Sequence, residues 1–375
     1  MAEITIRSAK QIVFGSGKRQ ELGEHAAQFG ERALIVCGQT ALQKSGALDE
    51  LSSALEGAGL EVSVFDRVEP EPSLETVEDG RSALREADCD VVIAAGGGSA
   101  LDVGKAVAGL AHDTRPVDHG VEATGIGVPC IALPTTSGTG AEVTPNSVLT
   151  NKDTGNKASI RGHGLLPEIA IVDPELTLSC PPDVTASSGL DALTQAIEAF
   201  VSTDANTFSA PLAEESARRI AGSLRQAVHH GDNLHAREDM ALGSLLAGLA
   251  LASARLGLIH GIAHPLGSLY HLPHGRVCGD LLPLEIEYNM PAAGPQYAYI
   301  ARAIGVGTSA DDLLSWAEQL VADLDADIDW AAAGLKPADF DEIIAPTLSS
   351  GSTARNPRPV SEADVRQLLE RLIED

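Results

Sequence analysis

The sequence predicts a chain of two domains, an α/β domain at residues 1–180 and an all-α domain at residues 181–375. Short apolar runs alternate with helix-like stretches in the first part, a pattern typical of a parallel sheet with helices on both faces. After Pro181 and Pro182 the strand signals give way to Ala- and Leu-rich segments at helical spacing. A length of 375 residues also fits about two domains of ordinary size.

Four apolar runs predict the main strands of the first domain. They cover residues 32–38, 61–65, 90–95 and 128–134, and a helix-like stretch at 48–58 separates the first two. Shorter strand candidates lie between Gly, Asn and Asp turns, at 148–150, 157–160 and 169–174. In the second domain the apolar spacing predicts helices, for example over 236–256 and 310–324.

The charge of the chain indicates which macromolecules it is not expected to bind. The chain carries 26 basic and 53 acidic residues, a formal net charge of -27 that repels phosphate backbones and anionic lipid. We therefore expect neither a nucleic acid nor a membrane partner. The five cysteines are far apart and form no Cys-x-x-Cys pair, and no signal sequence or long apolar segment occurs. Buried reduced thiols and a cytoplasmic location are predicted.

A glycine-rich turn follows the predicted strand 90–95. Gly96, Gly97 and Gly98 lead into Ser99 and a helix-like stretch. Residues without side chains let a phosphate approach the backbone, and the first N–H groups of a helix attract anions. A second polar turn, residues 134–144, gathers hydroxyl groups around two glycines after the next strand. Taken singly, the alternatives are a plain tight turn and a solvated Ser/Thr loop. Because open α/β sheets bind ligands where successive strands end, the pair favours a nucleotide site.

Polar side chains at helical spacing predict a second site, in the helical domain. Asp191 and Gln195 stand four residues apart, as do His260 and His264, so each pair lies on one face of a helix. Together with His274, these residues can form a metal site or an acid/base pocket. Gln195 is unusual in such a set, because its amide oxygen is a neutral ligand.

These segments together resemble the iron-containing (group III) alcohol dehydrogenases. Four ordered motifs that span nearly the whole chain carry the resemblance: Gly96 to Ser99 with Asp102 and Lys105, residues 134–144, Gly-Leu-Asp-Ala-Leu at 189–193, and His-Gly-Ile-Ala-His-Pro-Leu-Gly at 260–267 with Pro-His-Gly at 273–275. The resemblance implies a Rossmann-like first domain and a helical second domain, the dehydroquinate synthase-like architecture. It also implies a nicotinamide cofactor and a metal in a cleft between the domains.

The resemblance further implies roles for single residues. Asp191, Gln195, His260 and His274 occupy the four metal-ligand places of the family, for Fe or Zn. His264 takes the place of a histidine assigned to substrate or proton handling, and His271 is a second candidate for the proton. The residues expected at the cofactor are Gly38, Gly97, Gly98, Ser99, Asp102, Thr135, Thr136, Thr139, Lys157 and Leu176. A homodimer and a small alcohol or aldehyde substrate are also implied.

Two departures from the family pattern affect these expectations. The second ligand place usually holds His, and Gln195 is a weaker donor, so the metal is Fe, Zn or absent. NAD-preferring members usually carry an Asp after the strand that ends near Val36, and this chain has Gly38 there. Because Gly38 does not repel a 2′-phosphate, both NAD and NADP stay open.

The predicted reaction is reversible hydride transfer between a nicotinamide and a small alcohol, with a metal that polarises the carbonyl as a Lewis acid. His264 or His271 would pass the released proton toward solvent. A cyclase or polyol dehydrogenase similar to dehydroquinate synthase is one alternative. Few basic residues other than Arg255 and Arg276 lie near the histidine motifs, which disfavours its phosphorylated substrates. A non-catalytic nucleotide-binding protein with a degenerate metal site and a purely structural acidic protein are the others.

Overall fold

The computed structural model describes residues 4–374, except positions 126, 154 and 156. The chain divides into two compact units. One, called the sheet unit, contains residues 6–180 and 232–241, and the other, called the helical unit, contains residues 4–5, 181–231 and 242–374. A parallel sheet with helices in the first unit and helices in the second confirm the predicted fold class.

The unit boundaries depart from the predicted domains in two segments, residues 4–5 and residues 232–241. Residues 232–241 lie in the sheet unit, although the sequence places them in an all-helical stretch. Arg237 Nη2 donates a hydrogen bond to the carbonyl oxygen of Cys180 over 3.0 Å, and Ser16 Oγ donates to Glu238 Oε1 over 2.7 Å. These long-range contacts, which no local pattern encodes, hold the segment there.

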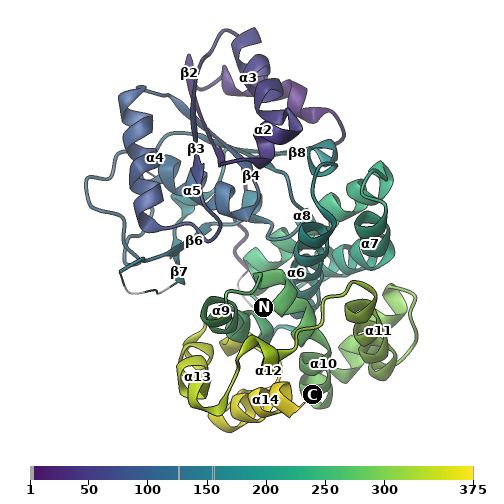
Figure 1. The fold of residues 1–375 in the computed structure, drawn as a ribbon. Coiled ribbons are helices and arrows are strands. Elements are labelled where there is room, and N and C mark those ends of the chain that lie inside the picture. Colours follow the sequence, from purple (N-terminus) through teal and green to yellow (C-terminus); the bar gives the residue numbers. More distant parts are fainter. Residues whose placement is uncertain (1–3, 126, 154, 156, 375) are drawn as a thin grey trace. The chain divides into compact units, whose positions relative to one another are not determined.

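A six-stranded parallel sheet forms the centre of the sheet unit (Figure 1). Its strand order is β1-β8-β5-β4-β2-β3, and all neighbours run parallel. The strands are β1 (Gln11–Phe14), β2 (Arg32–Gly38), β3 (Glu61–Val68), β4 (Val91–Gly96), β5 (Cys130–Pro134) and β8 (Ile169–Val172). The sequence pattern does not single out β1, a short edge strand whose residues are exposed or half-buried.

Helices cover both faces of this sheet, because alternate residues of each strand face opposite sides. On β2, Leu34 and Val36 belong to one core and Ala33 and Ile35 to the other. The first core includes α4 (Leu74–Glu86) and α5 (Gly98–Gly109), and the second includes α1 (Leu22–Ala26), α2 (Ala41–Ser45) and α3 (Ala47–Gly57). A 3-10 turn, η1 (Lys18–Glu21), precedes α1.

An antiparallel hairpin is attached to α5. Its strands are β6 (Asn146–Thr150) and β7 (Lys157–Arg161). The carboxylate of Asp102 on α5 accepts a hydrogen bond from Val148 N over 2.9 Å. The backbone carbonyl of Asp102 accepts one from Ser147 Oγ over 2.8 Å. The fully buried ammonium of Lys105 lies 3.1 Å from Asp102 Oδ1 and donates to carbonyls at the start of the hairpin. Two short 3-10 turns flank the hairpin, η2 (Ala141–Val143) and η3 (His163–Leu165), and η4 (Pro174–Thr177) follows β8.

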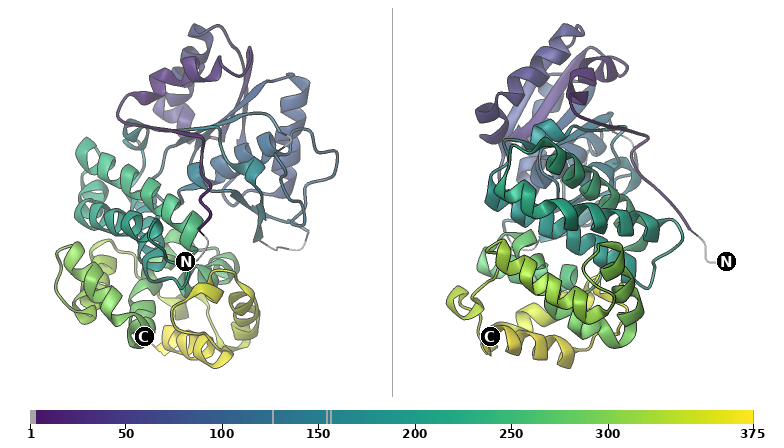
Figure 2. Two further views of the ribbon diagram at one scale, coloured as in Figure 1. Left: turned by 180° about the vertical axis from the view of Figure 1, so that it is seen from behind. Right: turned by 90° about the vertical axis from the view of Figure 1, so that its right-hand side faces the viewer.

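The helical unit contains no strand among its described residues (Figure 2). Its helices are α6 (Pro182–Val201), α7 (Ser209–His229), α9 (Leu258–Tyr270), α10 (His274–Ala303), α11 (Ala310–Asp323), α12 (Trp330–Ala333), α13 (Phe340–Ser349) and α14 (Glu362–Glu374), with the turns η5 (Pro337–Asp339) and η6 (Thr353–Arg355). Helix α8 (Leu234–Ala254) begins in the sheet unit and continues into the helical unit.

Glycines bring the first turns of α10 against α6. A Cβ on Gly275 would lie 2.1 Å from the carbonyl oxygen of Ser187, and a Cβ on Gly279 would lie 2.6 Å from Leu190 Cδ1. Both distances are shorter than any real carbon contact, so only glycine permits the crossing. The close approach sets the N-terminus of α10 beside the middle of α6.

No single described helix is long and apolar enough to cross a membrane. The successive helices α8 and α9 reach the required length and composition only as a pair, and the chain bends by 108° between them.

Candidate metal centre and nucleotide-binding turn

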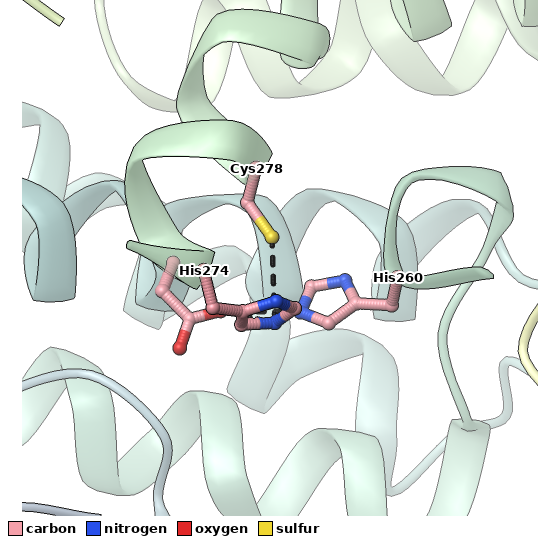
Figure 3. A group of neighbouring side chains, drawn as sticks. His260, His274 and Cys278 are labelled. Carbon is pink, nitrogen blue, oxygen red and sulfur yellow. Dashed lines mark hydrogen bonds and ion pairs between the residues drawn. The ribbon is translucent and has the colours of Figure 1, made fainter. Parts of the chain in front are cut away.

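Three helices of the helical unit bring Asp191, His260 and His274 together. Asp191 comes from the middle of α6, His260 from the first turn of α9, and His274 from the first residue of α10. His260 Nε2 lies 3.1 Å and His274 Nε2 3.9 Å from the same oxygen, Asp191 Oδ1. Figure 3 shows the two imidazoles pointing toward one another, and Asp191 and His260 are nearly inaccessible to solvent. The predicted convergence of these three side chains is therefore present.

His260 is held between two buried carboxylates. Glu198, one helical turn after Gln195 on α6, contacts the Nδ1 atom of His260 with one oxygen and accepts a hydrogen bond from its backbone N with the other. When Nδ1–H donates to Glu198, the lone pair of a neutral His260 at Nε2 points at Asp191 Oδ1. Two acceptors face each other in that state, and a proton or a metal cation between them relieves the repulsion.

The electrostatics of the cluster favour a cation. Burial alone would lower the pKa of His260, but the carboxylates of Glu198 and Asp191 raise it to about 10. Burial would raise the pKa of Asp191, and the hydrogen bond from His260 and the charge of His274 lower it instead. Behind Glu198, burial and the Glu198 charge raise the pKa of Glu285 well above its usual value. Glu285 therefore keeps its proton, and the carboxylates of Asp191 and Glu198 are the groups that favour a cation at His260.

Gln195 lies one helical turn after Asp191 on α6 and is 4% exposed. A hydrogen bond from its amide contributes to the lowered pKa of Asp191. Its Oε1 atom is buried and accepts no hydrogen bond within the described part of the chain. A buried acceptor without a donor costs about 1–3 kcal/mol, which a nearby cation or water would offset. The lone pair of His260 and this oxygen both indicate that the residues fit a bound divalent metal.

The two predicted proton carriers differ in their placement. The His264 ring stacks on the His274 ring, with centroids 4.6 Å apart and planes 11° apart, so His264 is directly beside the cluster. His271 caps the C-terminus of α9 with a left-handed backbone conformation and is exposed. Within the described residues, no hydrogen bond or ring contact joins His271 to the cluster. Of the two, His264 is the better placed to exchange a proton with a group bound at the cluster.

Sequence reasoning missed two residues of this site. Glu198 lies seven residues after Asp191, which puts both on one face of α6, and Cys278 lies four residues after His274 on α10. The helical spacing that pointed to Asp191 and Gln195 therefore also pointed to them. Cys278 was expected to be an ordinary buried thiol, but its sulfur lies 3.5 Å from His274 Nε2 (Figure 3).

The two polar turns of the sheet unit lie against each other. Gly97 and Gly98 begin α5, and a Cβ on Gly98 would lie 2.9 Å from Thr139 Cγ2. A Cβ on Gly97 would lie 3.5 Å from both the Cγ2 and the Oγ1 of Thr136. Hydroxyl groups thus face a backbone without side chains at the N-terminus of a 12-residue helix, an arrangement that suits a phosphate.

The other residues expected at the cofactor lie in varied surroundings. Thr135 donates its backbone N–H to Gly96 over 2.9 Å, and Ser99 is half-buried in the first turn of α5. Gly38 ends β2 at the same edge of the sheet. Asp102 is occupied by the hairpin, Lys157 forms an ion pair with Glu71 over 2.5 Å, and Leu176 belongs to a hydrophobic core. The contacts of these last three are structural ones within the sheet unit.

Glu142 follows the second polar turn and is almost fully buried. Burial raises the pKa of Glu142 to about 6, although a backbone hydrogen bond and the charge of Lys105 act in the opposite direction. This folded-state pKa exceeds the ordinary value of 4.5, so protonated Glu142 is the form that the folded protein favours. Its contribution to the free energy of unfolding is fully present below pH 4.5 and is lost as the pH rises through about 6.

We therefore expect Glu142→Gln, which cannot ionise, to be more stable than the parent protein at about pH 7.5 by up to about 2 kcal/mol. Urea unfolding at that pH and at about pH 4 would show the gain only at the higher value. Replacement of the exposed Glu56 by Gln is the control, with no such difference expected. A gain of the same size at both pH values would contradict the assignment.

Comparison with known proteins covers both units. Residues 9–174 match the family model described as iron-containing alcohol dehydrogenase, and residues 185–373 match the C-terminal model of the same family. The chain is 39% identical to the 1,3-propanediol dehydrogenase of Citrobacter freundii, over 95% of each chain. It is 32% identical to the NADPH-dependent butanol dehydrogenase of Clostridium saccharobutylicum, over 96% of each chain. A crystal structure of 1,3-propanediol oxidoreductase matches with a TM-score of 0.93 and 37% identity, and covers 99% of this chain and all of the other.

Proposed function

The chain belongs to the iron-containing alcohol dehydrogenase family, and on that premise we propose that it catalyses reversible hydride transfer between NAD(P) and a small alcohol or aldehyde, with a divalent metal at the Asp191 cluster. The observation that carries this proposal is the convergence of Asp191, His260 and His274 on one point, where the surrounding carboxylates favour a cation. The relatives named above act on small alcohols or their aldehydes, which supports the same substrate class.

Each residue of the cluster has a distinct task. Asp191, His260 and His274 would hold the metal, and Gln195 lies beside Asp191, to which its amide contributes a hydrogen bond. When bound, the metal would act as a Lewis acid on the substrate oxygen. Glu198 orients His260 through Nδ1 and keeps its Nε2 lone pair directed into the cluster. His264, stacked on His274, is the candidate that passes the alcohol proton toward solvent.

The sheet unit would bind the dinucleotide at its polar turns. The backbone of Gly97, Gly98 and Ser99 would face the pyrophosphate at the start of α5, and Thr136 and Thr139 border the same turn. Gly38 at the end of β2 offers no charge to a ribose 2′-phosphate, and one relative is named for its use of NADPH. We expect the enzyme to accept NADPH as well as NADH.

Replacement of Gly38 by Asp is expected to shift this preference toward NADH. A Cβ at Gly38 would meet only the carbonyl oxygen of Val68, at an ordinary 3.7 Å, so the side chain fits. A carboxylate near the ribose repels a 2′-phosphate and accepts a hydrogen bond from a 2′-hydroxyl. The ratio of kcat/KM with NADH to kcat/KM with NADPH should rise by about tenfold or more. Gly38→Asn is the uncharged control of the same size, and an equal shift in both variants would exclude the charge effect.

A direct test combines metal analysis with turnover. The purified protein, reconstituted with Fe²⁺ or Zn²⁺, is assayed for NADH and NADPH consumption over a panel of small aldehydes. Metal-dependent turnover is the expected result. Nucleotide binding without turnover would favour a non-catalytic protein. A dehydroquinate synthase-like cyclase acting on a phosphorylated substrate is disfavoured, because the Arg276 guanidinium already donates to the carbonyls of Ala326 and Asp327.

A further inference from the structure

Cys278 lies where a metal ligand would be expected. It follows His274 by one turn of α10, its side chain is inaccessible to solvent, and it forms no disulfide. One donor atom from each of Asp191, His260, His274 and Cys278 lies within 4.8 Å of the other three donors. Figure 3 shows the Cys278 sulfur pointing at the two imidazoles from α10. The thiol thus faces the same point as the three predicted ligands.

Three of the six separations between these donors are close to those around a tetrahedral ion. Zn²⁺ holds nitrogen and oxygen at about 2.0–2.2 Å and sulfur at about 2.3 Å, so neighbouring donors lie about 3.3–3.6 Å apart. The sulfur of Cys278 is 3.5 Å from His274 Nε2, and Asp191 Oδ1 is 3.1 and 3.9 Å from the Nε2 atoms of His260 and His274. These three separations lie within about 0.5 Å of the ideal value, and the other three are at most 4.8 Å.

The chemistry of the donors favours Cys278 over Gln195. Protein zinc sites are built from thiolates, imidazoles and carboxylates, and a neutral amide oxygen is a poorer ligand than any of these. The Gln195 amide also contributes a hydrogen bond to Asp191, the role of a group that orients a ligand.

We propose that Cys278 is the fourth protein ligand of the metal, which makes the centre an Asp-His-His-Cys site in which Gln195 positions Asp191. This inference rests on the proposed function for the presence of a metal and goes beyond it in the ligand set. Thiolate ligation favours Zn²⁺ over the harder divalent ions. It also assigns to α10 two ligands one helical turn apart, His274 and Cys278.

X-ray absorption spectroscopy of the zinc-loaded full chain tests the ligand set without reference to activity. The expected spectrum contains one sulfur at about 2.3 Å together with nitrogen and oxygen at about 2.0–2.2 Å. Cobalt-loaded protein should show a thiolate-to-cobalt charge-transfer band in the near ultraviolet. Both sulfur signatures should disappear in Cys278→Ser and persist in Cys89→Ser, which removes a thiol from the sheet unit.

Zinc affinity separates the two candidate donors. Loss of a ligand should cost at least about 100-fold in affinity, whereas loss of an orienting group should cost about 10–100-fold. Cys278→Ser is therefore expected to weaken Zn²⁺ more than Gln195→Ala does. A zinc-loaded parent protein with only nitrogen and oxygen neighbours, or no metal binding at all, would overturn the proposal.

Alcohol turnover on the same preparation keeps the two proposals distinguishable. Turnover by a metal centre without sulfur would refute the Cys278 ligand and leave the proposed function intact. A sulfur-ligated metal without turnover of any alcohol or aldehyde, with either nicotinamide, would refute the function and leave the ligand set intact.

Discussion

Replacement of His260 by alanine is expected to release the metal and to lower kcat/KM for the alcohol by about 10³-fold or more, since Lewis-acid stabilisation supplies several kcal/mol. His260 touches Asp191 through Nε2 and Glu198 through Nδ1, so its loss removes one donor and the orientation of another. Metal content measured by elemental analysis and steady-state kinetics with NADH and NADPH check the two effects on the same sample.

The same variant should be less stable than the parent in the metal-free state. Without the His260 cation, the carboxylates of Asp191 and Glu198 stay buried without their partner, and a broken buried pair costs about 3–5 kcal/mol. Urea unfolding measures the difference. His235→Ala on α8, where the side chain is exposed, is the matched control and should change neither metal content nor stability. Full activity in His260→Ala would exclude the metal-dependent mechanism.

Replacement of Gly275 by alanine is expected to disturb the same centre without touching a ligand. The new Cβ would lie 2.1 Å from the carbonyl oxygen of Ser187 and 3.0 Å from Asp191 Cβ, so α10 must move away from α6. Because His274 and Asp191 lie on those two helices, we expect an affinity loss for Zn²⁺ of about 10–100-fold. Overpacking should also destabilise the fold by about 1–3 kcal/mol.

The control for Gly275→Ala lies on the same helix. A Cβ on Gly294 would meet only Met290 Cγ, at 3.9 Å, so Gly294→Ala should leave metal affinity unchanged and stabilise α10 by about 0.5–1 kcal/mol. Metal titration and urea unfolding of both variants provide the comparison. Unchanged zinc affinity in Gly275→Ala would show that the crossing of α6 and α10 does not set the ligand geometry.

Much of the sheet unit could be predicted from local patterns. The continuous apolar runs of β2 and β4 predict a parallel sheet, because strands covered on both faces are apolar throughout. The glycines before α5 predict the turn between strand and helix. The edge strand β1 escaped prediction because four partly exposed residues carry little apolar signal. The homodimer and the preference between NAD and NADP stay predictions.

Sequence patterns predicted the metal centre only in part. Helical spacing pairs Asp191 with Gln195 and His260 with His264, because neighbours four apart share a face. It does not say which member of each pair faces the other helices. In the structure His260 meets Asp191 and Glu198, while His264 stacks on His274 and Cys278 approaches the same point.

The sequence by itself thus determined the family, the two-part fold and the polar side chains available for chemistry, since these follow from residue order and periodicity. The tertiary structure alone decided which donors converge. Asp191, His260 and Cys278 are separated by up to 87 positions in the chain, and only the glycine-permitted crossing of α6 and α10 and the docking of α9 bring their donor atoms within 4.8 Å of one another. No local propensity encodes such an approach, because it depends on the shape of side chains far apart in sequence.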